Sequence, residues 1–231
     1  MAMNRRQFSA LAASTLLTGV SNAADPLPGQ TKNTKFAVNV EMWWSKEKEF
    51  TKRLENAAAL GFKAVEFWPW RNKNIPAVIE TCKKHDITIT QFTAWGFTPG
   101  LNDPKNHSKF LEEIEASCET AKKLDCKMMT VVGGNDIKDV SQEKMHENII
   151  EGLKKAAPIA EKHGIMLILE PMNIKVDHKG HCLYGSVPSI KIIRAVNSPK
   201  VFQKIPLSYI HVVKIPVEFN LRTVDRPDDF Y

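Results

Sequence analysis

Apolar and polar residues follow a helical spacing in three long stretches of the chain. Each stretch carries an apolar stripe that recurs every three or four residues, which predicts a helix with one face on a core. The stripes are Phe50, Leu54, Ala57 and Ala58; Leu111, Ile114, Cys118 and Ala121; and Met145, Ile149, Leu153, Ala156 and Ala160. A shorter helix is predicted around Val78, Ile79 and Cys82, and Pro76 suits its first turn.

The same junction follows each of these four predicted helices. The helical pattern ends on Gly or Asp, and a run rich in apolar and β-branched residues comes next. The ending residues are Gly61, Asp86, Asp125 and Gly164, at spacings of 25, 39 and 39 residues. Both residue types tolerate the left-handed conformation that ends a helix. His85 and His163 fall in last turns, where the helix dipole favours positive charge, so we interpret them as helix-end residues and not as ligands.

The junctions, together with an apolar run at residues 36–40, predict five strands that alternate with four helices. Such alternation is typical of right-handed βαβ crossovers and a parallel sheet. A dinucleotide-binding fold needs a Gly-rich turn after the first strand, but residues 41–45 contain no glycine. We therefore predict an α/β chain of the (β/α)8 TIM-barrel type, incomplete, with about five to six of the eight units in residues 36–200.

Candidate chemistry gathers where the predicted strands end, which is the edge that carries the active site in this kind of barrel. Glu170 is the leading candidate, because it follows the apolar run at residues 165–169. The next residue, Pro171, ends the strand at Glu170. We predict that Glu170 is catalytic and that the substrate contacts are Glu66, Trp68, Asn135, His178 and His181.

Each predicted substrate contact also has a plain structural interpretation. Glu66 serves equally well as a salt-bridging residue. For Trp68, as for Trp43 and Trp95, barrel packing is the better interpretation. The two histidines of residues 174–181 would then be incidental members of a solvated loop. Four cysteines, Cys82, Cys118, Cys126 and Cys182, lack the spacing of a zinc site or a disulfide framework, and small buried hydrophobes are the better interpretation.

Strand-end carboxylates suit the movement of a proton between adjacent carbons of a hydroxy-carbonyl compound. This reaction needs a base near the carbon and something that holds the developing enediolate charge. A divalent cation such as Mg or Mn would hold the charge, but hard cations require several oxygen ligands, so one Glu is not enough.

Three segments, at residues 36–44, 66–71 and 169–178, resemble the hydroxypyruvate isomerase branch of the xylose isomerase-like barrels over residues 36–201. The resemblance implies a divalent metal, Mg or Mn, and isomerisation or epimerisation of a small sugar or hydroxy acid. It assigns Glu170 as metal ligand and acid/base. It also implies an Asp, a His or Gln and a second Glu from later strands, but residues 202–216 contain no acidic residue. We therefore expect residues 201–231 to be divergent, frameshifted or the edge of a fragment. Residues 209–215 are a candidate sixth strand.

The first residues predict export. Arg5 and Arg6 precede an acid-free run at residues 9–20 and a small-residue cleavage site at residues 21–24, which resembles a twin-arginine signal. We predict a leader at residues 1–23, a linker at 24–35 and a periplasmic location. Removal of the leader takes away two arginines and no acid, so the net charge falls from +6 to +4.

Partners are expected to be small molecules, a carbohydrate or hydroxy acid. The lysines are scattered and not clustered in a stripe with aromatics, which gives little support for nucleic acid. No segment after the leader approaches 18 consecutive apolar residues, so we expect no stable membrane span. A homo-oligomer, a non-catalytic binding module and a metal-dependent phosphodiesterase or endonuclease of the same barrel superfamily stay open.

Overall fold

The computed structural model describes residues 27–31 and 35–203. These residues form one six-stranded sheet in which every pairing is parallel and the strand order is the sequence order. The strands are β1 Ala37–Asn39, β2 Ala64–Phe67, β3 Thr88–Trp95, β4 Met128–Val132, β5 Met166–Glu170 and β6 Val201–Gln203. The five predicted strands are confirmed, and a sixth begins at Val201. The predicted leader and the candidate strand at 209–215 lie outside the described residues.

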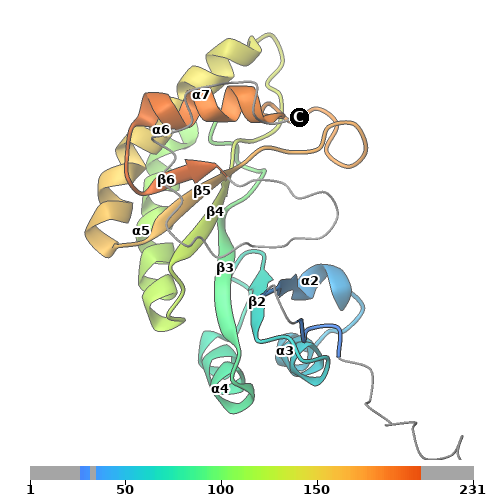
Figure 1. The fold of residues 1–231 in the computed structure, drawn as a ribbon. Coiled ribbons are helices and arrows are strands. Elements are labelled where there is room, and N and C mark those ends of the chain that lie inside the picture. The colour runs from blue at the N-terminus through green and yellow to red at the C-terminus, as the bar shows by residue number, and fades with distance from the viewer. Residues whose placement is uncertain (1–26, 32–34, 204–231) are drawn as a thin grey trace, which may run out of the picture.

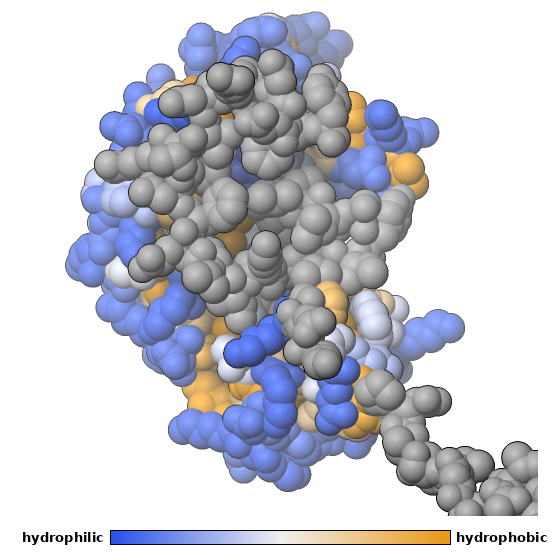
Figure 2. All heavy atoms as spheres, viewed as in Figure 1, coloured by the Kyte–Doolittle hydropathy of each residue, from blue (hydrophilic) through white to orange (hydrophobic). Residues whose placement is uncertain are grey.

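Helices connect the strands and lie along one face of the curved sheet (Figure 1). They are α2 Val40–Trp43, α3 Phe50–Ala59, α4 Ile75–His85, α5 His107–Lys123, α6 Gln142–His163 and α7 Ser186–Val196, with a 3-10 turn η1 at Pro104–Asn106. Hydrophilic residues cover most of the outer surface that Figure 2 shows in colour. Among the described residues, no helix has both the length and the apolar character of a membrane span. The alternation of strands and helices and the parallel sheet confirm the predicted α/β class.

All four predicted junctions end a helix in the left-handed conformation. The φ angles are 81° at Gly61, 54° at Asp86, 49° at Asp125 and 69° at Gly164. In each case the next amide donates to a carbonyl five residues earlier, as Ile87 does to Cys82 at 2.9 Å and Ile165 does to Ala160 at 3.0 Å. This is the Schellman arrangement, which satisfies carbonyls that the helix end leaves open. The recurrent motif thus turns each helix back toward the next strand.

The core lies between the helices and the face of the sheet that they cover. All five apolar positions predicted for α6 are buried, as are Ile114, Cys118 and Ala121 of α5. Aromatic rings continue this core across β2 and β3, with Phe50 edge-on to Phe67 at 5.3 Å between centroids and Phe67 stacked on Phe92 at 5.6 Å. Trp95 is buried against Phe110, so its packing interpretation is confirmed.

The four cysteines are also core residues. All are buried and free, and burial raises the pKa of the Cys118 thiol to about 12. A thiol in that state is protonated and unreactive at neutral pH. The sequence-based interpretation of the cysteines as small hydrophobes is confirmed.

Candidate active site

A chain of polar side chains crosses β1 to β4 on the sheet face opposite the helices. Glu66 of β2 is 2% exposed, and its Oε1 accepts a hydrogen bond from Asn39 Nδ2 at 3.1 Å. Its other oxygen accepts one from Gln91 Nε2, and Gln91 Oε1 accepts one from Thr130 Oγ1 at 2.8 Å. The neighbours Phe67 and Phe92 point the other way, into the helix-facing core, as alternation along a strand requires. Glu66 is therefore a buried carboxylate held by two side-chain amides.

Glu170, the predicted catalytic residue, shares this polar face. It is the last residue of β5 and pairs with Val132 of β4, while Ile168 pairs with Thr130. Because side chains alternate along each strand, Thr130, Ile168 and Glu170 lie on the same side, and Leu169 is fully buried on the other. Glu170 is half-buried. The predicted base thus stands at the carboxyl edge of the sheet on the face that carries Glu66.

Asn39 connects this polar chain to the loop that follows β1. It is the N-cap of α2, where its Oδ1 accepts hydrogen bonds from the amides of Glu41 at 3.0 Å and Met42 at 3.1 Å. The Nδ2 of the same side chain donates to Glu66. One side chain therefore fixes both the start of α2 and the orientation of the buried carboxylate.

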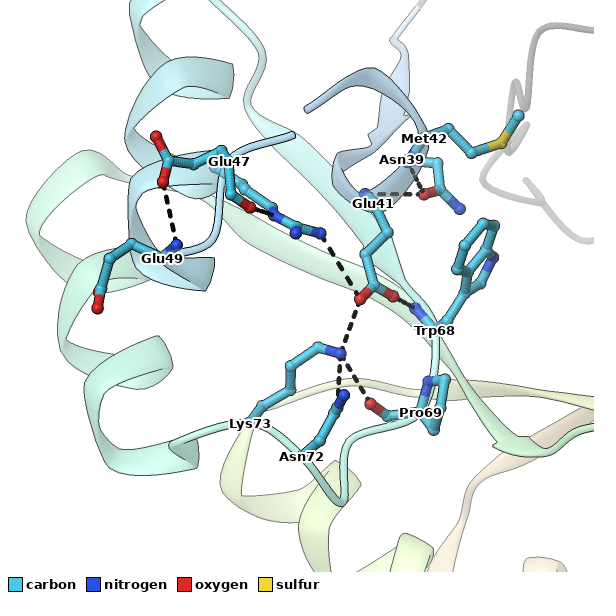
Figure 3. A network of polar contacts seen from close by, with 10 residues as sticks. Asn39, Glu41, Met42, Glu47, Glu49, Trp68, Pro69, Asn72 and Lys73 are labelled. Carbon is cyan, nitrogen blue, oxygen red and sulfur yellow. Dashed lines mark hydrogen bonds and ion pairs between the residues drawn. The ribbon is translucent and has the colours of Figure 1, made fainter. Parts of the chain in front are cut away.

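Glu41 in turn holds the segment after β2, which carries Trp68 (Figure 3). Its Oε2 accepts a hydrogen bond from the Trp68 amide at 2.6 Å, and its Oε1 accepts one from Lys73 Nζ at 2.8 Å. Arg53 Nη1 lies 3.8 Å from the same Oε1. The Trp68 backbone is thus fixed while its side chain stays 47% exposed at the mouth of the sheet.

The far end of the same segment is anchored on α5. Arg71 makes a bidentate contact with Glu113, with 2.7 Å between Nη2 and Oε2, and its guanidinium lies 4.2 Å from the centre of the Trp70 ring. The Trp70 indole donates to Ser117 Oγ at 2.9 Å. These contacts hold the loop after β2 at both of its ends.

The predicted residues Asn135, His178 and His181 lie together where β4 and β5 end. Asn135 and His181 form an antiparallel bridge, and the ring of Phe97 stacks on His178 at 4.9 Å and meets His181 edge-on at 5.5 Å. Asn135 is exposed and His178 is half-buried. These three residues and Glu170 therefore lie at the carboxyl ends of β4 and β5. Glu66 and Trp68 lie at the carboxyl end of β2.

His181 is fully buried, and the protein bonds both nitrogens of its ring. Nε2 accepts a hydrogen bond from the Gly134 amide at 3.3 Å. Nδ1 accepts one from the Leu183 amide at 3.1 Å and lies 2.8 Å from the carbonyl oxygen of the same residue. Burial lowers the pKa of His181, which favours the neutral ring. In this geometry His181 shapes the turn after β4, and a contact with substrate stays a prediction.

A divalent cation at Glu170 would need further ligands from the described residues. Hard cations require several converging oxygen ligands. Within residues 27–31 and 35–203, three or more His, Cys, Asp or Glu side chains are placed for a metal in a single group, formed by Glu115, Glu119 and His163. That group lies on α5 and α6, away from the strand ends. The described residues therefore do not complete a metal cage around Glu170.

Sequence reasoning missed the group on α5 and α6. His163 is the last residue of α6, as predicted, but it also faces two carboxylates. Glu115 and Glu119 are four residues apart on one helix, a spacing that puts both on the same face. This spacing was the available signal, but nothing in the sequence shows that His163 packs beside it.

The family model for the xylose isomerase-like TIM barrel matches residues 54–203, more than half of the chain. The chain belongs to this family. The match spans β2 to β6 and includes Glu170, so the resemblance inferred from the sequence is confirmed.

Curated relatives are similar in sequence, and a solved structure has a similar fold. Hydroxypyruvate isomerase from Escherichia coli strain K12 is 27% identical over 69% of this chain and 63% of its own length. A 2-oxo-tetronate isomerase from Haemophilus influenzae is 25% identical over 78% of this chain and 71% of its own length. A crystal structure titled AP endonuclease, family 2 from Brucella melitensis aligns with a TM-score of 0.69 and 21% identity, over 78% of this chain and 71% of that one. The chain spans less than two thirds of the E. coli relative, and the fold is TIM-barrel-like.

Proposed function

We propose that this family member is a sugar or hydroxy-acid isomerase or epimerase in which the Glu170 carboxylate moves the proton. The observation that carries the proposal is the position of Glu170. It ends β5 on the polar face of the sheet, inside the segment that the family model matches. The relatives named above, isomerases of hydroxypyruvate and of a 2-oxo-tetronate, support the same class of reaction.

The proposed step conserves protons and electrons within the substrate. Glu170 takes the proton from the carbon next to a carbonyl, and the C–H electron pair moves into an enediolate. In an isomerase, the protonated Glu170 returns the proton to the neighbouring carbon. The hydroxyl proton on the first carbon moves to the oxygen of the former carbonyl, and the new carbonyl forms at the first carbon. General acid/base catalysis of this kind contributes about 10²- to 10⁴-fold to the rate.

The enediolate charge needs a partner, and the family resemblance implies a divalent cation, predicted as Mg or Mn. The described residues offer Glu170 for such an ion without the other ligands that a hard cation requires. A requirement for the divalent cation stays a prediction, to be tested by activity before and after treatment with a chelator.

The loop after β2 would form a wall of the substrate pocket. Trp68 presents an exposed ring beside the strand ends, and Glu41 fixes its backbone. An aromatic face of this kind suits the apolar C–H side of a small sugar. We propose that Glu66, Asn135, His178 and His181 complete the polar lining.

The test compares Glu170→Gln with the matched variant Glu151→Gln, which changes an exposed glutamate on α6. Hydroxypyruvate and a 2-oxo-tetronate are incubated with each protein in D2O with Mg or Mn, and exchange of the carbon-bound proton is followed by NMR. We expect Glu170→Gln to lower the exchange rate by about a hundredfold or more, and Glu151→Gln to leave it unchanged. Equal rates in all three proteins would refute the role of Glu170.

The same assay separates the alternatives. A non-catalytic binding module would bind these compounds without exchange in either the parent or the variant. An endonuclease is not favoured, because the likeness to the Brucella structure is 21% in sequence and shows the fold alone.

A further inference from the structure

We propose that Glu115, Glu119 and His163 bind a divalent transition-metal ion, Zn²⁺ or an ion with similar preferences, that ties α5 to α6. Glu115 and Glu119 stand one turn apart on α5, and His163 ends α6. One ligand atom from each of the three lies within 4.8 Å of the other two. The proposed site is separate from the strand-end site and does not depend on the proposed isomerase function.

The state of His163 points to a ligand. Its side chain is 2% exposed, and Nε2 contacts Glu115 Oε1 at 2.7 Å. Nδ1 is buried and has no hydrogen-bond partner among the described residues, although Glu119 Oε1 lies 3.3 Å away. That contact is close, but its geometry is not that of a hydrogen bond. A buried ring nitrogen that faces an anion without a hydrogen bond is an available metal ligand.

The 3.3 Å separation fits coordination to one ion. Tetrahedral zinc with bonds of about 2.1 Å holds its ligand atoms roughly 3.4 Å apart. An ion between Nδ1 and Glu119 would therefore need little movement of either residue. The Glu115 side chain is on the same face and partly exposed, so it can rotate to supply a third ligand, with water as the fourth.

Charge and chemistry select the class of ion. One imidazole and two carboxylates suit Zn²⁺, Co²⁺ or Ni²⁺ better than Mg²⁺, which prefers oxygen ligands alone. The competing ammonium groups of Lys162 and Lys122 lie 3.1 and 3.3 Å from these carboxylates, but both side chains are exposed. Their displacement into water costs little, because ion pairs between exposed side chains contribute little to stability.

The position of the group indicates a structural site. α5 and α6 run back to the amino ends of β4 and β5, so His163 lies two residues before Ile165 and at the opposite edge from Glu170. A bound ion there would join two helices whose packing covers the sheet. The expected effect is therefore on stability and not on catalysis.

The chain offers a matched comparison at an earlier junction. His85 ends α4 as His163 ends α6, and its Nε2 lies 3.9 Å from the single carboxylate of Glu55. Among the described residues, no second carboxylate joins His85 and Glu55 in a group of three possible metal ligands. His85→Asn is thus a control that removes a helix-end histidine without removing a proposed site.

Binding of Zn²⁺ and Co²⁺ is measured by calorimetry and by thermal unfolding in the Glu170→Gln background, so that the strand-end site does not contribute. We expect one ion per chain, a higher Tm with Zn²⁺, and visible d–d absorption with Co²⁺. Glu119→Gln changes an exposed side chain and should leave the fold intact while weakening binding by roughly tenfold or more. His163→Asn should do the same, and His85→Asn should bind like the parent.

Two outcomes would overturn the proposal. One is no saturable binding in the Glu170→Gln background. The other is an unchanged affinity and Co²⁺ spectrum in Glu119→Gln, because a bound ion would then have to lie elsewhere. Loss of isomerase activity in Glu170→Gln has no bearing on either result, so failure of this proposal and failure of the proposed function are distinguishable.

Discussion

The replacement Lys73→Met tests the buried ion pair that holds the loop after β2. The Lys73 side chain is 3% exposed and that of Glu41 is 12% exposed. The ammonium group donates to Glu41 Oε1 at 2.8 Å, to Pro69 O at 3.0 Å and to Asn72 Oδ1 at 2.8 Å (Figure 3). These contacts use all three of its donors. Met keeps most of the length of the side chain and removes the charge and every one of these bonds.

The expected loss of stability follows from the Glu41 carboxylate, which loses its ammonium partner in Lys73→Met. Removal of one partner from a buried ion pair typically costs about 3 to 5 kcal/mol, because the other charge is left without compensation. Glu41 would keep the Trp68 amide and Arg53 at 3.8 Å, so the lower end of that range applies. We expect Lys73→Met to lower the free energy of unfolding by about 3 kcal/mol.

The control is Lys52→Met, which breaks the exposed pair with Glu55 at 2.8 Å. Lys52 is 55% exposed, so this change should lower the free energy of unfolding far less than Lys73→Met does. Urea unfolding followed by circular dichroism gives both values. The double variant Glu41→Gln/Lys73→Met should recover part of the loss, because it no longer buries an unpaired carboxylate. Equal costs for Lys73→Met and Lys52→Met would refute the reasoning.

Two further predictions concern pH and export. The pKa of His181 in the folded protein lies below its ordinary 6.5, so as the pH falls below 6.5 the unfolded chain binds the proton first and stability declines until folded His181 also titrates. His181→Gln should therefore lose less stability than the parent between pH 7.5 and pH 5 in urea unfolding, and equal losses would count against this cause. Replacement of Arg5 and Arg6 by Lys should retain the protein in the cytoplasm, and undiminished recovery from the periplasm would contradict the twin-arginine interpretation.

The fold was predictable because its signals are local. Apolar stripes at helical spacing, and a Gly or Asp at each helix end, involve residues that are close together in the sequence. All four predicted junctions are present in the structure. Two helices, α2 and α7, were not predicted from the sequence, for different reasons. α2 is four residues long and depends on the Asn39 cap. α7 is rich in β-branched residues such as Ile192 and Ile193, which weaken the helical signal.

The candidate site was only partly predictable because its partnerships are not local. The position of Glu170 after an apolar run identified a strand end from sequence alone. The partners of Glu66 come from strands 27 and 25 residues away, and no pattern in the sequence pairs Asn39 or Gln91 with it. Likewise His163 and Glu115 are 48 residues apart and meet only because α5 packs on α6.

The sequential order of the strands also bears on how the chain acquires its structure during synthesis. Each strand of the described sheet pairs only with strands that are adjacent in sequence, as Val65 of β2 does with Ile89 of β3. When a strand leaves the ribosome, the strand with which it pairs has therefore already been translated. Assembly can then proceed from the amino end without a search for distant partners, and the growing edge of the sheet advances with translation.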